Sequence, residues 1–230
     1  MVVMTATGAH HAPEGDAGSD RPIREVRLPG GADLVVRTGR PDDVAALHAL
    51  FEELSPTDRY RRFFSAYRPD DAFVEKIVSL PERGGRCLVA EISDASGRHL
   101  VGEADFVPLD DGDAELSMVV GARWRGWLAP YLLDVLVEQA ADDGFANLRA
   151  EVLATNRPML ALLRRRGAVH LDDEDWSTAR STIGTTAIRI PTWPGSHERP
   201  RVLVELCAGH WHASDEAREA GFDVITCPGP

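Results

Sequence analysis

The stretch from residue 115 to residue 141 constrains the fold more than any other part of the chain. Apolar residues alternate at its start, at Leu116, Met118 and Val120, as in a strand with one buried face. Further along, apolar positions recur at helical spacing, namely Leu132, Leu133, Leu136, Val137 and Ala140. A turn from a strand end into a helix start exposes unpaired N–H groups and the positive end of the helix dipole. The segment Arg123–Pro130 is therefore predicted to be a turn that can seat a phosphate.

Local signals on both sides of this unit predict further strands and helices. Strands are expected at residues 33–37, 86–92, 99–107, 115–120, 148–153, 168–171 and 185–190. Helices are expected from Pro41 to Leu54, from Pro56 to Phe64, and from Asn156 to Gly167. The turn signal Ser93–Gly97 predicts that the strands at 86–92 and 99–107 form a hairpin. This mixture of elements predicts an α/β (α+β) domain with a central mixed, twisted sheet flanked by helices.

Shifts in composition divide the chain into three parts. Residues 1–22 are rich in small and polar residues without apolar periodicity, and they are expected to form a disordered tail. Residues 23–195 form the main domain. Residues 196–230 follow a proline-rich stretch and read as strand 202–206, helix 214–220 and strand 222–226. One βαβ unit cannot bury its own faces, so this extension is expected to dock on the main domain or on a partner.

Charge and composition narrow the function classes. The formal charge of −12 argues against a nucleic-acid partner, which needs clustered positive charge. No apolar stretch reaches the roughly 20 residues of a membrane span, and no signal peptide is visible, so a cytoplasmic protein is expected. Three distant cysteines fit a reducing compartment. The group Cys207, His210, His212 and Cys227 lacks a specific zinc spacing, so no metal is predicted.

From about residue 34 to residue 172, several short motifs occur in a familiar order. They are Val35–Arg37 with Pro41–Asp43, Leu54–Phe64, Ala114–Val120, Glu151–Asn156, and Met159–Leu160 with Gly167. In this order the chain resembles the GNAT superfamily of acyl-CoA-dependent N-acetyltransferases. Within it, the chain is most similar to the acetyltransferase domain of bacterial Pat-type protein lysine acetyltransferases. The resemblance implies the GNAT fold, acetyl-CoA as acyl donor, and an amine acceptor that is a small molecule or a protein lysine. A homodimer is possible.

The resemblance also implies which residues contact the cofactor. They are Met118, Val119, Val120, Arg125, Gly126, Trp127, Leu128, Ala129, Pro130 and Asn156. The family's pyrophosphate turn carries two small residues, and two alignments fit it. One starts at Arg123; the other, which is preferred, matches Arg125, Gly126 and Ala129 and keeps the helix in register. In that alignment the second glycine is missing and an indole stands in the turn. Glycine allows close phosphate approach, so the turn is expected to bind CoA weakly or not at all.

Catalysis of this kind needs a base for the amine and donors for the thioester carbonyl. Glu115 falls where Pat-like enzymes place the base, although it can also be an ordinary acid at a strand end. Glu103 and Asp105 are weaker substitutes. The family's tyrosine acid is replaced by Leu163, so solvent would supply that proton. Asn156 can place the cofactor or only cap a helix.

Two functions therefore remain open. The first is an acyl-CoA-dependent N-acyltransferase that works by direct attack of the amine. The second is a GNAT-fold binding or regulatory module that has lost catalysis. Trp124 and Trp127 could stack on an adenine ring or cover the acyl site, or they could fill a groove that the cofactor no longer occupies.

Overall fold

The computed structural model describes residues 22–28, 31–171, 176–185, 204–205 and 224–225. Its main element is an eight-stranded sheet in the order β1-β2-β3-β4-β5-β6-β8-β7. The strands are β1 (Arg24–Arg27), β2 (Asp33–Thr38), β3 (Arg86–Asp94), β4 (Gly97–Pro108), β5 (Ala114–Val120), β6 (Asn147–Leu153), β7 (Ala168–Leu171) and β8 (Thr178–Gly184). All neighbouring strands run antiparallel except β5 and β6, which are parallel.

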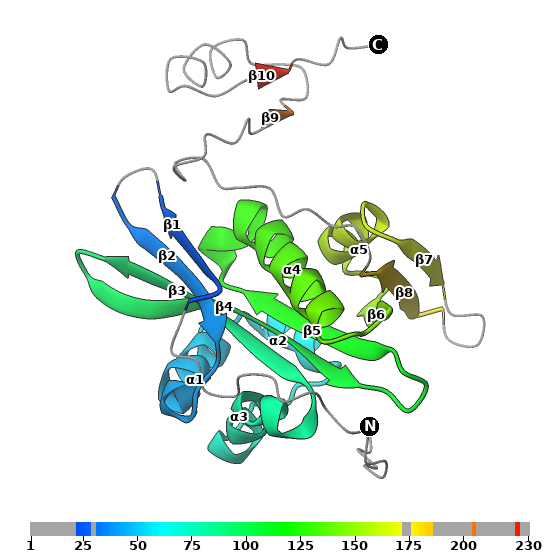
Figure 1. Cartoon of the computed structure of the whole chain (residues 1–230), viewed down its shortest axis with the longest axis horizontal. Helices are drawn as coiled ribbons and strands as arrows, with labels where there is room; N and C mark the ends of the chain where they lie inside the picture. The colour runs from blue at the N-terminus through cyan, green and yellow to red at the C-terminus, as the bar shows by residue number, and fades with distance from the viewer. Residues whose placement is uncertain (1–21, 29–30, 172–175, 186–203, 206–223, 226–230) are drawn as a thin grey trace.

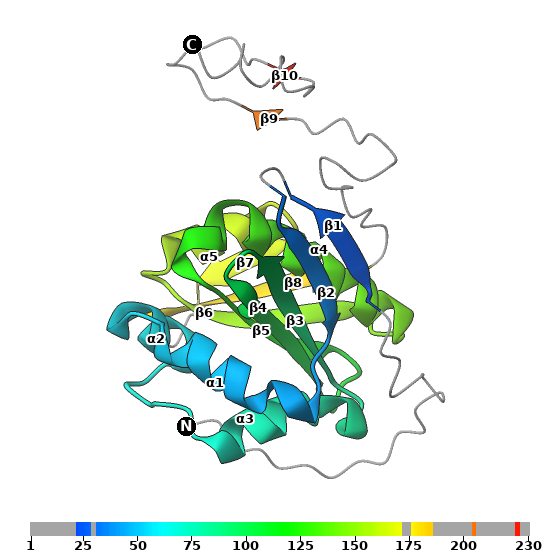
Figure 2. The same cartoon turned by 90° about the vertical axis from the view of Figure 1, so that its left-hand side faces the viewer.

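Helices cover both faces of the sheet (Figures 1 and 2). The α-helices are α1 (Val44–Glu52), α2 (Pro56–Phe63), α3 (Asp71–Val78), α4 (Arg125–Asp142) and α5 (Arg157–Arg164). Short 3-10 helices are η1 (Pro41–Asp43), η2 (Leu80–Arg83) and η3 (Ala122–Trp124). The larger core joins α4 and α5 to one face, with Leu132, Leu136 and Phe106 fully buried. The smaller core joins α1 and α3 to the opposite face around Phe51 and Val74.

Side-chain caps explain where several helices begin. The Asp58 N–H donates to Ser55 Oγ (3.2 Å) at the start of α2, where Pro56 takes the first helical position. Asp70 caps α3 in the same way, with its Oδ1 accepting the Phe73 N–H at 2.9 Å. These contacts satisfy donors that have no partner inside the helix.

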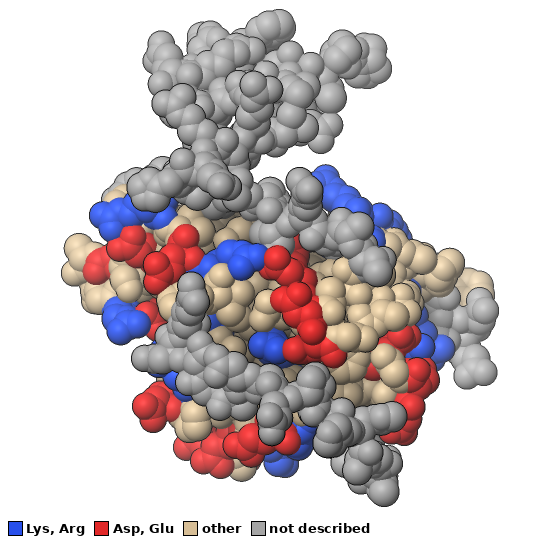
Figure 3. All heavy atoms as spheres, in the orientation of Figure 1, with Lys and Arg blue, Asp and Glu red and all other residues tan. Residues whose placement is uncertain are grey.

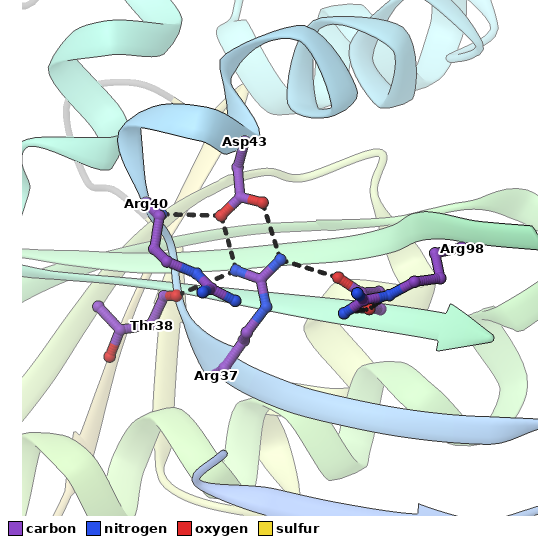
Figure 4. A network of polar contacts seen from close by, with 6 residues as sticks. Arg37, Thr38, Arg40, Asp43 and Arg98 are labelled. Atoms are coloured by element: carbon purple, nitrogen blue, oxygen red, sulfur yellow. Dashed lines mark hydrogen bonds and ion pairs between the residues drawn. The ribbon is translucent and has the colours of Figure 1, made fainter. Parts of the chain in front are cut away.

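A buried ion-pair network joins β2, η1 and β3 (Figure 4). The Arg37 guanidinium donates to both oxygens of Asp43 (2.6 and 2.8 Å) and to Glu91 Oε2 (2.8 Å). Arg98 holds the other oxygen of Glu91 at 2.6 Å, and the Arg40 N–H donates to Asp43 at 2.8 Å. Charge-assisted, bidentate pairs of this kind fix geometry strongly. The network therefore fixes η1, and with it the start of α1, to strands β2 and β3.

The predicted fold class, a mixed sheet flanked by helices, is confirmed. The hairpin of β3 and β4 forms as predicted. Strand β8 ends at Gly184 and pairs with β6 and β7, and it was not predicted. The strand predicted at residues 185–190 lies outside the described residues except for Thr185, which is not in a strand. Helix α3 and strand β1 were not predicted.

The ends of the chain lie mostly outside the described residues. The predicted tail at 1–22 and the predicted helix at 214–220 belong to these parts. Of the predicted extension, the structure describes β9 (Val204–Glu205) and β10 (Val224–Ile225), which pair in parallel. Within the described residues, no helix combines the length and apolar character that crossing a membrane requires.

Candidate functional site

Strands β5 and β6 are paired over a short distance only. Their register contains two pairs, Ala114 with Leu148 and Glu115 with Arg149. On its other side β5 stays paired with β4 as far as Val120, and β6 stays paired with β8 along its whole length. The two strands therefore part after Glu115, and the middle of the sheet opens between them.

The alternation along β5 divides its residues between the two faces of the sheet. Met118 and Val120 pack with the core beneath α4. Val119 packs with the core beneath α1 and α3, and Glu115 and Ser117 share its face by alternation. Three residues predicted to line the cofactor, Met118, Val119 and Val120, thus lie on the strand that borders the opening, and Glu115 stands where the strands part.

Glu115 has the properties of a base. Its side chain is half-buried, and among the described residues no hydrogen-bond partner holds its carboxylate. Burial raises the pKa of Glu115, and the nearby charges of Glu151 and Asp105 raise it further. A carboxylate with a raised pKa and no bound partner can accept a proton near neutral pH.

The two weaker candidates for the base are already engaged. Asp105 Oδ2 accepts hydrogen bonds from Arg62 Nη2 (2.8 Å) and Ser117 Oγ (2.7 Å). Glu103 is fully buried on the same strand, with its Oε2 3.4 Å from Arg62 Nη2. Burial and the neighbouring Asp105 raise the pKa of Glu103 well above its ordinary value. Helix α2, through Arg62, therefore covers both carboxyl groups, and Glu115 remains the accessible one.

The predicted turn at Arg123–Pro130 is wrong in its conformation. Residues 122–124 form η3, and α4 begins at Arg125, so Pro130 lies inside the helix. Gly126 is helical, and a Cβ placed on it would meet nothing within 4 Å. Leu128 is fully buried and packs near Gly102. At this end of α4, Arg125 and Gly126 are thus exposed, and the Leu128 side chain faces the core instead.

Arg125, the expected phosphate ligand, is held by two other groups. Its Nη1 and Nη2 donate to the two oxygens of Asp58 at 3.2 and 2.9 Å. Its Nε donates to the Val120 carbonyl at 3.2 Å. These contacts join the start of α4 to α2 and to the end of β5, where the strands are apart.

The two tryptophans of this region pack against each other. The rings of Trp124 and Trp127 meet edge to face, with centroids 6.1 Å apart and planes at 85°. The Arg123 guanidinium lies 5.2 Å from the centroid of Trp124. Both indoles are partly buried against the core beneath α4. They therefore line the start of α4 beside Arg125.

The remaining predicted residues lie at α5. Asn156 Oδ1 accepts the Met159 N–H at 3.4 Å, which is the helix-capping role considered from the sequence. Leu163, at the position of the family's tyrosine, is fully buried in the core. Ala129 and Pro130 are partly buried on α4. No general acid therefore comes from α5 at that position.

The charges on the surface are mixed. Figure 3 shows acidic side chains in several groups, with basic side chains scattered between them. Among the described residues, no group of three or more His, Cys, Asp or Glu is arranged to hold a metal ion. The four His and Cys residues considered for zinc lie outside those residues.

Solved structures share this arrangement, although no protein-family model matches the chain. The GNAT domain of S. lividans PAT is similar over 70% of this chain and 96% of its own, with 21% identity and a TM-score of 0.61. An N-acetyltransferase from Staphylococcus aureus Mu50 covers 66% of this chain and 99% of its own, with 17% identity and a TM-score of 0.53. The yncA structure from Salmonella typhimurium, solved with its cofactor acetyl-CoA, covers 69% of this chain and 98% of its own, with 16% identity and a TM-score of 0.54. At these identities the likeness establishes the architecture: the chain has the fold of the GNAT N-acetyltransferases.

Proposed function

We propose that this protein is an acyl-CoA-dependent N-acyltransferase that uses acetyl-CoA as its donor. The observation that carries the proposal is Glu115, a carboxylate with a raised pKa and no described partner, at the point where β5 and β6 part. Beyond Glu115 the backbone of β5 has no partner strand on the β6 side, and we propose that the acyl donor lies against this edge. The fold shared with N-acetyltransferases supports this use of the opening.

In the proposed reaction the amine attacks the thioester carbonyl directly. Its nitrogen forms a bond to the acyl carbon while the carbon–sulfur bond breaks, and CoA leaves as a thiolate. Glu115 accepts the proton that the amine loses, directly or through one water. The thiolate takes a proton from solvent, since Leu163 is buried at the position of the family's acid. The protein's main contribution is to hold the two reactants together.

The acceptor is proposed to be a cationic amine, either a small molecule or a protein lysine. Glu115 and Glu151 lie on the same face of neighbouring strands, on either side of the opening. Two carboxylates there favour a positively charged group over an anion. The amine must lose its proton before attack, and Glu115 is placed to take it.

Calorimetry followed by kinetics tests the proposal. Acetyl-CoA should release measurable heat on titration, and turnover should be followed with a panel of cationic amines. Glu115→Gln should lower kcat by about 10²–10⁴-fold while leaving the affinity for acetyl-CoA nearly unchanged. Glu75→Gln, an exposed change on α3, is the matched control and should change neither. Turnover that survives Glu115→Gln would remove Glu115 from the role of base.

The alternative function is a binding or regulatory module that no longer catalyses. Two observations favour it: Arg125 is already occupied by Asp58, and the start of α4 carries Trp127 where the family has a small residue. This alternative predicts no heat with acetyl-CoA even at millimolar concentration. Saturable binding of acetyl-CoA would exclude a module that has lost its cofactor.

A further inference from the structure

The contacts of Arg125 leave little of its guanidinium for a phosphate. A guanidinium grips an anion best through two N–H groups on one edge. The edge made by Nη1 and Nη2 is taken by Asp58, at 3.2 and 2.9 Å. The edge made by Nε and one Nη lacks one free donor, because Nε already donates to the Val120 carbonyl at 3.2 Å. No edge therefore keeps two donors for a bidentate grip.

Asp58 also brings a negative charge to the place where a pyrophosphate would lie. Its side chain is 15% exposed, and the Arg125 side chain is 41% exposed. Two anions cannot share one guanidinium edge without repulsion, which is strongest where water is partly excluded. A phosphate at Arg125 must therefore displace Asp58 or bind weakly beside it.

Asp58 has other partners when Arg125 leaves. Arg61, one turn away on α2, places its Nη1 3.4 Å from Asp58 Oδ1. Ser55 Oγ donates to Asp58 Oδ2 at 2.5 Å. Because these groups remain, an exchange of partners leaves no uncompensated carboxylate, which would otherwise be costly. The ion pair between Asp58 and Arg125 can thus separate while Asp58 keeps Arg61 and Ser55 as partners.

From this geometry we propose that Asp58 competes with the cofactor's pyrophosphate for Arg125, and that cofactor binding releases α2 from the start of α4. The inference rests on the proposed function, since it assumes that CoA binds here. Helix α2 also carries Arg62, which covers Asp105 and Glu103 beside the proposed base. Binding of the cofactor would in this way loosen α2, which covers the face of the sheet on which Glu115 lies.

Calorimetric titration with CoA tests the competition. Asp58→Asn keeps the size of the side chain and removes its charge. It should lower the Kd for CoA by about two- to five-fold, the range expected when a partly exposed ion pair no longer has to break. Asp70→Asn is the matched control, because Asp70 caps α3 and does not contact Arg125. It corrects for the general loss of one negative charge and should leave the Kd nearly unchanged.

A double variant ties the effect to Arg125. Arg125→Gln should weaken CoA binding, and Asp58→Asn added to it should give no further gain. A second measurement needs no substitution: saturating CoA should speed amide hydrogen exchange in residues 56–63 of the wild-type protein. Slower exchange there would contradict the release of α2.

The outcomes separate the two proposals. If the wild-type protein binds CoA, but Asp58→Asn binds no more tightly than Asp70→Asn, the competition is refuted. Weaker binding by Asp58→Asn would show that Asp58 positions Arg125 for the phosphate instead. If neither the wild-type protein nor any variant binds CoA, the proposed function itself fails, and the competition fails with it.

Discussion

The buried network around Arg37 allows a quantitative test of what stabilises the fold. The Arg37 side chain is 8% exposed and neutralises two carboxylates, Asp43 and Glu91, that are 10% and 7% exposed. Arg37→Met keeps much of the volume but leaves the buried Asp43 with only the Arg40 N–H, and the buried Glu91 with only Arg98. Breaking a buried ion pair in this way costs about 3–5 kcal/mol. For a chain of this size that corresponds to a fall in Tm of roughly 10 °C.

The pH dependence of the fall in Tm shows whether the fall has an electrostatic origin. Burial raises the pKa of Asp43 and the pKa of Glu91. The hydrogen bonds and charge of Arg37, together with those of Arg40 at Asp43 and of Arg98 at Glu91, outweigh burial and hold both pKa values below their ordinary 3.8 and 4.5. Carboxyl groups with a lowered pKa stabilise the fold above those ordinary values and stop doing so as the pH falls through the lowered ones. The difference in Tm between wild type and Arg37→Met should therefore be greatest near neutral pH and shrink in acid.

Thermal unfolding followed by circular dichroism is the assay, run near pH 7 and near pH 4. Arg98→Met is the matched control, because Arg98 pairs with the same Glu91 but has a side chain 70% exposed. Because Arg98 lies largely in water and Glu91 keeps Arg37, loss of this pair should cost at most about 1 kcal/mol, so the variant should melt within a few degrees of wild type. Equal losses for Arg37→Met and Arg98→Met, or a loss for Arg37→Met that does not depend on pH, would refute the reasoning.

Two further variants address the site. Glu151→Gln removes a negative charge that raises the pKa of Glu115. The acidic limb of the plot of kcat/KM against pH should therefore move to lower pH, by less than about one pH unit. A shift to higher pH would contradict this prediction. Gly126→Ala places a methyl group in open space on α4, so it should raise Tm by about 2–4 °C through better helix propensity. The same methyl group would lie close to the proposed position of the phosphates, so the variant should also bind CoA more weakly. A lower Tm would argue against a helical Gly126, and an unchanged Kd would argue against a phosphate beside it.

The sequence predicted most elements whose signals are local. Helix α2 begins at Pro56 after its cap Ser55, and α5 begins at Arg157 after its cap Asn156. A capping side chain and a nearby proline mark such a start without help from distant residues. Strand β8 was missed because its inward residues include the small Ala179 and Ser181, which give a weak apolar alternation.

The start of α4 could not be read from the sequence in the same way. Pro130 suggests a helix start, yet it is the sixth residue of α4, and the missing N–H at that position falls near the exposed end of the helix. The partners of Arg125 were also invisible, because Asp58 stands 67 residues away in the chain. Glu115 could be proposed from a family motif, but its lack of a partner depends on strands and helices brought together by the fold.

The tryptophan pair at the start of α4 gives the protein an optical signal of its own. Trp124 and Trp127 lie edge to face, partly buried, beside the arginine that would meet the cofactor. Trp176, by contrast, is 80% exposed and will emit like an indole in water. Acrylamide should therefore quench Trp176 before this pair. Trp193 and Trp211 lie outside the described residues, so the three other tryptophans are best replaced by Phe. The emission of that variant then reports on the start of α4 and can follow events at Arg125 in real time.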